Sequence, residues 1–241
     1  MLTVAHVSDL HLGAHDPDTV RSLIADVTAA RPVLTVVTGD VTMRARVREF
    51  RQARTVLDRL PQPLLVVLGN HDLPLISPLR VLWPYGRFRT WITSDLQPVV
   101  RVPGLTAVGL SSMPRWRWKD GRITRRQAAR ITGTFGAAAE QDLRLVALHH
   151  PPGSLAGRGR LREAVREAGV HLLVAGHTHI PDVRPEHGTV VVVAGTATSH
   201  RTRGTGQSWN LIRINSTTIT VCERYATGAG WSTGRVIKVS R

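Results

Sequence analysis

The feature that most constrains the fold is a run of five apolar residues that leads directly into four chemically useful ones. Residues 64–68 read Leu-Leu-Val-Val-Leu, and Gly69, Asn70, His71 and Asp72 follow. A continuous apolar run of this length is typical of a strand buried on both faces, as in parallel sheets. Gly69 permits a sharp backbone turn. We therefore expect the next three residues just beyond the carboxyl end of a central strand, where open α/β sheets bind ligands.

The same pattern recurs in four other places, where a short apolar segment ends in Asp or His. These are residues 4–8 before Asp9-Leu10-His11, 33–38 before Gly39-Asp40, 145–148 before His149-His150-Pro151, and 171–175 before Gly176-His177-Thr178-His179. One such ending carries little information. Five in one chain predict a single shared site at one edge of a sheet.

Helix signals separate the first three of these strands. Asp16-Pro17 is a helix start, and apolar residues at helical spacing predict a second helix over 44–60. The order β-α-β-α-β favours a parallel sheet with right-handed crossovers. After His179, strand-like segments at 190–194, 209–214 and 219–221 follow without helices between them. We predict an α/β fold with two packed sheets and helices outside, in one domain over residues 1–241.

Composition narrows the class of protein. The chain has 241 residues and a single cysteine, which excludes an internal disulfide framework and a cysteine-based metal site. No apolar run approaches the length of a membrane span, and no secretory signal is visible. We expect a protein of the cytoplasm without a transmembrane segment. The oligomeric state does not follow from the sequence.

The formal net charge of +15 raises the question of nucleic acid as a partner. All but two of the 32 basic residues are arginine, the exceptions being Lys119 and Lys238, and they are scattered along the chain. No basic motif with interleaved aromatic residues stands out. Nucleic acid is therefore a possible but not a favoured partner, and attraction of a small anionic substrate is the better interpretation.

The side chains at the five strand ends are oxygen or neutral imidazole donors, and none is a thiolate. Such donors suit divalent Mn, Fe, Zn, Co or Ni. Seven of them exceed the needs of one tetrahedral ion and suit two ions that share a carboxylate. The candidate ligands are Asp9, His11, Asp40, Asn70, His149, His177 and His179. Two-metal sites promote in-line displacement at phosphorus, with a metal-held hydroxide as the nucleophile.

These blocks, in this order over residues 9 to 179, resemble the five signature blocks of the calcineurin-like metallophosphoesterase family. The resemblance implies a four-layer αββα sandwich of two mixed sheets flanked by helices, with a dinuclear centre. It also implies a role for each candidate. One ion would be held by Asp9, His11 and His179, the other by Asn70, His149 and His177, with Asp40 as the bridge. His71 would meet the phosphate and protonate the leaving oxygen, and Asp72 would orient its imidazole.

Simpler interpretations exist for each residue alone, since Asp9 could be a helix cap and Asn70 a turn residue. They do not explain why all of these side chains occur at strand ends. His149 and His150 compete for one ligand position, because neighbouring strand residues point to opposite sides. The family pattern favours His149.

The substrate is less constrained than the chemistry. Segments such as Ser111-Ser112, Lys119-Asp120-Gly121 and Gly195-Thr196-Ala197-Thr198 resemble the branch that contains the class III cyclic-nucleotide phosphodiesterases. We therefore predict metal-dependent hydrolysis of a phosphodiester, with a cyclic-nucleotide-like small molecule favoured. A nuclease or a nucleotide or lipid-headgroup phosphatase on the same site is the alternative. A non-catalytic scaffold of the same fold is a third reading.

Overall fold

The computed structural model describes residues 1–75, 77–228 and 230–241. Two six-stranded mixed sheets form its centre. The first has the order β14 (Gly230–Ser240), β13 (Thr218–Thr227), β12 (Ser208–Ile214), β1 (Leu2–Val7), β2 (Leu34–Val37), β3 (Leu64–Val66). The second has the order β10 (Asp182–Glu186), β11 (Thr189–Gly195), β9 (Leu172–His179), β7 (Leu143–Leu148), β5 (Leu105–Leu110), β4 (Val99–Val102). A short third sheet pairs β6 (Gly121–Arg122) with β8 (Leu155–Ala156).

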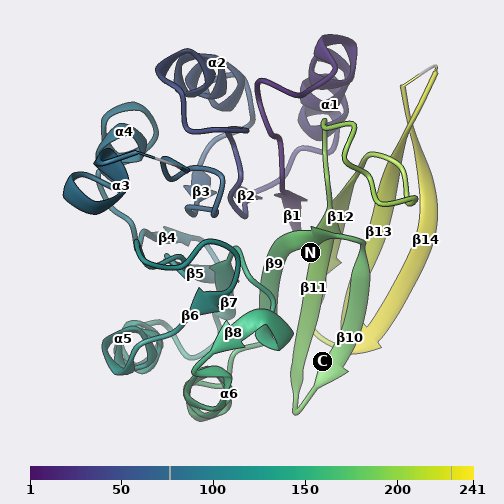
Figure 1. The fold of residues 1–241 in the computed structure, drawn as a ribbon. Coiled ribbons are helices and arrows are strands. Elements are labelled where there is room, and N and C mark those ends of the chain that lie inside the picture. Colours follow the sequence, from purple (N-terminus) through teal and green to yellow (C-terminus); the bar gives the residue numbers. More distant parts are fainter. Residues whose placement is uncertain (76, 229) are drawn as a thin grey trace.

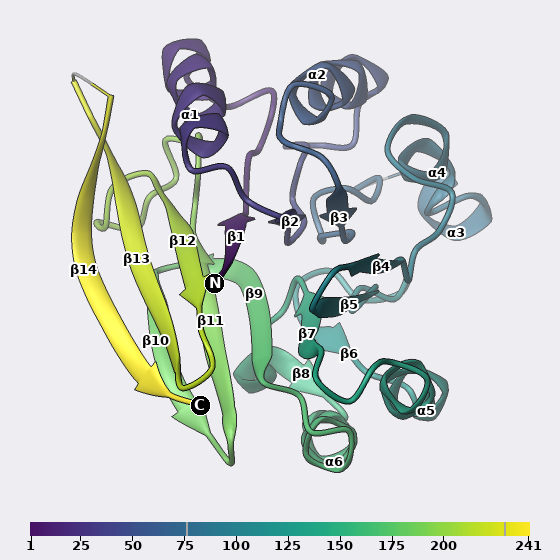
Figure 2. The same cartoon turned by 180° about the vertical axis from the view of Figure 1, so that it is seen from behind.

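Helices cover the outer faces of both sheets. They are α1 (Pro17–Ala29), α2 (Val47–Leu57), α3 (Leu79–Leu82), α4 (Gly86–Trp91), α5 (Arg125–Gly136) and α6 (Arg158–Glu167), with a 3-10 turn at Pro152–Ser154. Figures 1 and 2 show α1 and α2 outside the first sheet and α5 and α6 outside the second. The predicted four-layer αββα arrangement is therefore confirmed.

Alternation along the strands builds these layers. Val4 and Val36 lie in the apolar core between the two sheets, whereas Ala5 and Val37 pack under the helices that cover the first sheet. Strands β1, β2 and β3 pair in parallel, and so do β5, β7, β9 and β11. All of the expected polar endings therefore come to one edge of the sandwich.

The sequence-based boundaries differ from the observed ones at the second helix. The helix expected over 44–60 spans Val47–Leu57, because the Glu49 carboxylate accepts the backbone N–H groups of Arg44 and Arg46 and holds them in a loop. Thr124 caps α5, with Gln127 completing a capping box, and that helix ends at Gly136. No helix of the described residues is long and apolar enough to cross a bilayer.

Candidate metal centre

The backbone at the candidate site adopts a conformation that most residues avoid. Asp9, His11, Asp40, His177 and His179 all have positive φ angles, between 47° and 72°. A non-glycine residue in this left-handed region is uncommon and costs free energy. Hydrogen bonds between the turns hold it: the Asp9 N–H donates to the Gly39 carbonyl at 3.1 Å and the His11 N–H to the Asp40 carbonyl at 2.9 Å. Such strain gathered at one place is a mark of a functional site.

The first group of candidate ligands comes from the ends of β1 and β9. Asp9 Oδ1 lies 3.1 Å from His179 Nε2 and 3.6 Å from His11 Nε2. The two Nε2 atoms of these histidines are 3.1 Å apart. All three side chains are buried. The structure thus brings together the residues expected to hold one ion.

The second group comes from the ends of β3, β7 and β9. Asn70 Oδ1 lies 3.1 Å from His149 Nε2 and 3.1 Å from His177 Nδ1. Asp40, at the end of β2, connects the two groups, because its Oδ2 lies 3.4 Å from His149 Nε2 and 3.8 Å from His11 Nε2. Asp40 is the carboxylate that occupies the position between them.

Backbone carbonyls set the orientation of the imidazoles. His149 donates Nδ1–H to the Thr38 carbonyl at 2.7 Å, and His179 donates Nδ1–H to the Arg201 carbonyl at 2.6 Å. In the neutral form of each ring, Nε2 is then left as an acceptor that faces the site. This is the arrangement in which histidine binds a metal ion.

The donor atoms fit divalent metal ions. Among the described residues, Asp9 Oδ1 and His11 Nδ1 are buried without a hydrogen-bond partner. Groups of Asp and His with ligand atoms close together include Asp9, His11 and His179, and Asp9, Asp40 and His149. Ligand atoms that each lie about 2.0–2.2 Å from one ion are separated from each other by roughly 3–3.5 Å. The separations in both groups are close to this range.

The charge of the pocket also favours a cation. Burial alone would raise the pKa of Asp9, but the neighbouring imidazoles of His11 and His179 hold that pKa well below its usual range. Burial likewise opposes ionisation of Asp40, yet the neighbouring His149 lowers the pKa of Asp40. Conversely, Asp40 raises the pKa of His149 to about 9, against the effect of burial. Two buried carboxylates therefore remain ionised and need positive charge beside them.

Glycines allow the turns to approach one another. A Cβ atom on Gly69 would lie 2.2 Å from the Asp40 backbone nitrogen, and one on Gly176 would lie 1.9 Å from Ser8 Oγ. Real Cβ atoms do not approach so closely, so only glycine fits at these two positions. The Gly-Asn-His-Asp and Gly-His-Thr-His patterns thus have a steric reason as well as a chemical one.

His71 lies at the half-buried rim of the site. Its Nδ1–H donates to the Met43 carbonyl at 2.8 Å, and its Nε2 lies 3.3 Å from Arg201 Nη1. Its backbone N–H donates to Asp40 Oδ1 at 2.8 Å. The imidazole is therefore fixed with Nε2 toward the more exposed side.

Asp72 differs from expectation in what it contacts. Its carboxylate accepts the backbone N–H groups of Gly69 at 3.0 Å and Thr42 at 2.9 Å, and the Thr42 hydroxyl at 2.9 Å. The contact that orients the His71 ring comes instead from Met43. Asp72 joins the two loops that carry Asp40 and Asn70, and burial together with the Asp40 charge raises its pKa to about 6.

His150 lies close enough to His149 and His177 to form a group that could hold a metal ion, but its ring nitrogens make hydrogen bonds of their own. Its Nε2–H donates to the Lys119 carbonyl at 2.8 Å, and its Nδ1 lies 2.8 Å from the Ser112 hydroxyl. Both ring nitrogens are thus engaged, although the centre of the ring lies 4.5 Å from that of His177, with the two rings tilted by 48°. The geometry supports His149 rather than His150 as the candidate ligand.

Several residues support the site in ways that the sequence did not predict. The Ser8 hydroxyl donates to Asp9 Oδ2 at 2.5 Å. The hydroxyls of Thr196 and Thr198 donate to the backbone carbonyls of Asp9 and Leu10 at 2.7 and 2.6 Å. The Gly-Thr-Ala-Thr segment is recognisable in the sequence, but its pattern does not predict a contact with the turn that follows β1.

Comparisons with known proteins agree with this geometry. Residues 2–181 match the family described as calcineurin-like phosphoesterase. The chain is 35% identical over 82 residues to the glycerophosphodiester phosphodiesterase GpdQ of Enterobacter lignolyticus, covering 30% of each protein. It is 35% identical over 74 residues to the UDP-2,3-diacylglucosamine pyrophosphatase LpxG of Chlamydia muridarum, covering 30% of this chain and 22% of the relative. The matches thus span less than a third of either curated relative.

A solved structure shows the same fold over almost the whole chain. A dimetal phosphatase from Danio rerio superposes with a TM-score of 0.72 at 14% identity, covering 99% of this chain and 98% of that one. At this identity the likeness concerns the fold alone. The family match extends over most of the chain and includes all five polar strand ends. The chain therefore belongs to the calcineurin-like phosphoesterase family, as its signature blocks predicted.

Proposed function

We propose that this protein is a metal-dependent phosphoester hydrolase that acts on a phosphodiester, with a cyclic-nucleotide-like small molecule favoured. The observation that carries the proposal is the pair of ligand groups joined by Asp40, whose Oδ2 lies within 3.8 Å of a histidine from each group. A site for two ions matches the needs of displacement at phosphorus. The assignment to the cyclic-nucleotide branch and the cytoplasmic location stay predictions from the sequence.

In this proposal the ligand roles follow the two groups. Asp9, His11 and His179 hold one divalent ion, Asn70, His149 and His177 hold the other, and Asp40 binds both. The bound ions would neutralise charge on the phosphoryl group and make a water nucleophilic near neutral pH. Mn, Fe, Zn, Co and Ni all suit a set of imidazole, carboxylate and amide ligands.

His71 is the proposed general acid. Its Nδ1–H is committed to Met43, so Nε2 is the atom that can hold a proton and deliver it to the leaving oxygen. The Arg201 guanidinium, 3.3 Å from that nitrogen, is placed to meet a phosphoryl oxygen. Asp72 acts as a positioning residue, because it ties the Asn70 turn to the loop after Asp40.

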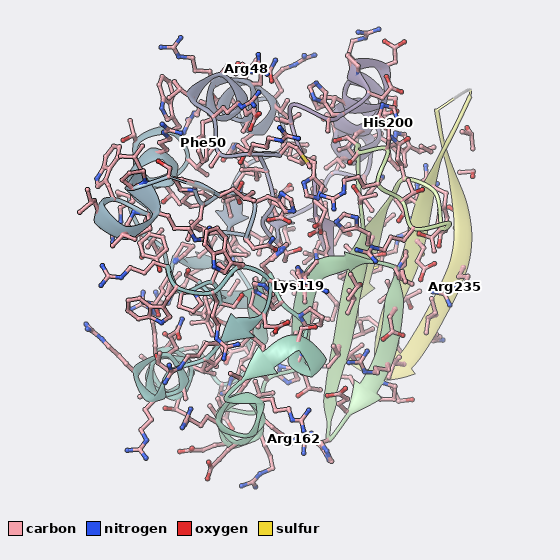
Figure 3. The ribbon with its side chains drawn as sticks, in the orientation of Figure 1. Arg48, Phe50, Lys119, Arg162, His200 and Arg235 are labelled. Atoms are coloured by element: carbon pink, nitrogen blue, oxygen red, sulfur yellow. The ribbon has the colours of Figure 1, made fainter. Side chains whose placement is uncertain are left out.

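The activities in the names of the two curated relatives favour a diester or pyrophosphate over a monoester. One is named a glycerophosphodiester phosphodiesterase and the other a pyrophosphatase. A nuclease, or a nucleotide or lipid-headgroup phosphatase, is the alternative on the same site. Figure 3 shows Arg48, Arg162 and Arg235 at widely separated edges of the molecule, which does not favour a single basic groove for nucleic acid.

The test is hydrolysis of bis-para-nitrophenyl phosphate and of 3′,5′-cyclic AMP by purified protein, with Mn²⁺ and with chelator. We expect metal-dependent turnover of the diester that is lost in Asn70→Ala. In His71→Ala we expect kcat to fall by about 10²–10⁴-fold while metal is still bound, as for loss of a general acid. The matched control is Asn215→Ala, in the exposed turn between β12 and β13.

The outcomes separate the alternatives. Cleavage of cyclic AMP supports the favoured substrate class, and cleavage of the synthetic diester alone moves the search to other phosphodiesters. Hydrolysis of single-stranded oligonucleotides with steep salt dependence would favour the nuclease. Protein that neither binds metal nor turns over either substrate would leave the scaffold interpretation.

A further inference from the structure

One part of the surface concentrates exposed apolar side chains. More than half of the large apolar side chains that are exposed, among the described residues, come from two parts of the chain, residues 75 and 81–83 and residues 116–118. We call this set the tryptophan platform: Leu75, Val81, Leu82, Trp83, Trp116 and Trp118. Val81 is 64% exposed, Leu82 78%, Trp116 65% and Trp118 56%. Apolar side chains gathered in this way on one surface mark an interaction site.

A buried arginine holds the two segments of the platform together. The Arg80 guanidinium donates to the carbonyls of Pro74 at 3.1 Å, Arg115 at 3.0 Å and Arg117. Its carbon atom Cζ also lies 4.3 Å from the centre of the Trp118 ring. From the other segment, Arg115 Nη1 donates to the Val81 carbonyl at 3.3 Å. The exposed rings are therefore presented from a fixed backbone.

The two segments that carry the platform are basic, although the exposed Asp120 follows the second segment directly. Residues 73–93 contain Arg80, Arg87 and Arg89, and residues 113–119 contain Arg115, Arg117 and Lys119; neither segment has an acidic residue. Arginine and tryptophan together are favoured at membrane interfaces, where rings sit among headgroups and guanidinium groups meet lipid phosphates. The surface is thus complementary to an anionic, partly apolar partner.

The platform is continuous with the metal centre. Asp72 is followed directly by Leu73 and Pro74, whose carbonyl accepts from Arg80. The second segment is fastened at both ends to His150, through the Ser112 hydroxyl and the Lys119 carbonyl, each at 2.8 Å. Figure 3 places Lys119 near the middle of the face it shows. The platform and the metal centre are thus connected through these two segments of the chain.

We propose that the tryptophan platform docks this protein on the surface of an anionic lipid bilayer. Stacking on single-stranded nucleic acid would use the rings but not the aliphatic Val81 and Leu82, which are among the most exposed apolar side chains of the platform. Insertion among acyl chains uses both kinds of side chain, and the surrounding arginines add attraction to anionic headgroups. If the proposed hydrolase function also holds, docking would bring phosphoesters of lipid headgroups to the site.

The test is sedimentation with vesicles of phosphatidylcholine alone and of phosphatidylcholine with about one third phosphatidylglycerol, without any catalytic readout. We expect binding to the anionic vesicles. We expect it to weaken by roughly tenfold or more in the double variant Leu82→Ser, Trp116→Ser, because two exposed apolar side chains no longer insert. The matched control is Val33→Ser, Val236→Ser, which alters two exposed apolar residues elsewhere and leaves the net charge unchanged. It should bind like the wild type.

A second measurement does not depend on the variants being folded. Lipids brominated near the headgroup should quench the tryptophan fluorescence of wild-type protein on anionic vesicles. Equal binding of the two double variants, with no quenching, would mean diffuse electrostatic attraction and would overturn the proposal. So would binding of an oligonucleotide but no vesicle, or self-association that the Leu82→Ser, Trp116→Ser variant abolishes. Because no substrate is involved, failure here is distinguishable from failure of the hydrolase proposal.

Discussion

Single residues at this site are chosen by backbone geometry as much as by their donor atoms. Asp9, His11 and Asp40 occupy left-handed conformations that most non-glycine residues avoid and that Asp and His adopt more readily than most. Their cost is offset by hydrogen bonds between turns, and by the glycines that let Asp40 and Ser8 approach. A change that only adds a methyl group can therefore disturb the site without removing any ligand.

Gly176→Ala tests this steric constraint. The new Cβ would meet Ser8 Oγ at 1.9 Å and Asp9 Oδ2 at 2.5 Å, so we expect a loss of about 1–3 kcal/mol in the free energy of unfolding and weaker metal binding. Gly133→Ala is the control, because nothing lies within 4 Å of its added Cβ in α5. That variant should gain about 0.5–1 kcal/mol. Urea unfolding measures both, and equal effects of the two changes would contradict the packing described here.

His6 gives the chain a predictable response to acid. It is fully buried between Thr38 and Asn210, and burial lowers its pKa to about 3 although Asp9 lies nearby. The unfolded chain takes up a proton near pH 6.5, whereas the folded chain does not until about pH 3. The contribution of the neutral imidazole is complete above pH 6.5 and is lost as the pH falls from 6.5 toward 3.

The measurement is urea unfolding between pH 7 and pH 4 for the wild type and for His6→Asn. The wild type should lose more stability over this interval, because its unfolding takes up the extra proton. The variant should start lower, since it loses the ring's contacts, but should depend less on pH. Parallel pH profiles for the two proteins would show that His6 does not titrate in this way.

At the scale of elements, β14 was the strand least visible in the sequence. β14 is an edge strand whose residues are mostly exposed, so it carries no apolar run, and it follows no helix. One buried acid joins it to its neighbour: the Glu223 carboxylate on β13 accepts from Arg235 on β14 at 2.6 and 2.9 Å and from the Tyr225 hydroxyl at 2.6 Å. The edge strand is thus attached by a polar contact as well as by its ladder.

Arg235→Ala should destabilise the protein by about 2 kcal/mol, because it removes the cation that pairs with a fully buried carboxylate. The Arg235 side chain is itself largely exposed, which keeps the effect below that of a fully buried pair. Lys238→Ala, on the same strand, should change stability by less than about 0.5 kcal/mol. Thermal unfolding compares the two, and similar losses would indicate that only the strand ladder matters.

For the whole molecule, the sequence predicted the layers and the cluster of ligands because both depend on strands with a clear apolar pattern. The Asn70 and His177 turns follow such strands, and parallel pairing brings their ends together. The sequence could not predict contacts that single atoms make between residues far apart in the chain. The Met43 carbonyl that orients His71, and the Thr196 hydroxyl that supports Asp9, depend on loop positions that no periodicity encodes.

The central claim is that this chain binds two metal ions at one site joined by Asp40. The most direct test is titration of metal-free protein with Mn²⁺, with bound metal counted after removal of the excess. We predict saturation at two ions per chain in the wild type and in the control Asp95→Asn, an exposed acid on a different loop, and a loss of tight binding at both positions in Asp40→Asn. The account would be contradicted by a wild-type protein that retains no Mn²⁺, or by an Asp40→Asn protein that still retains two ions.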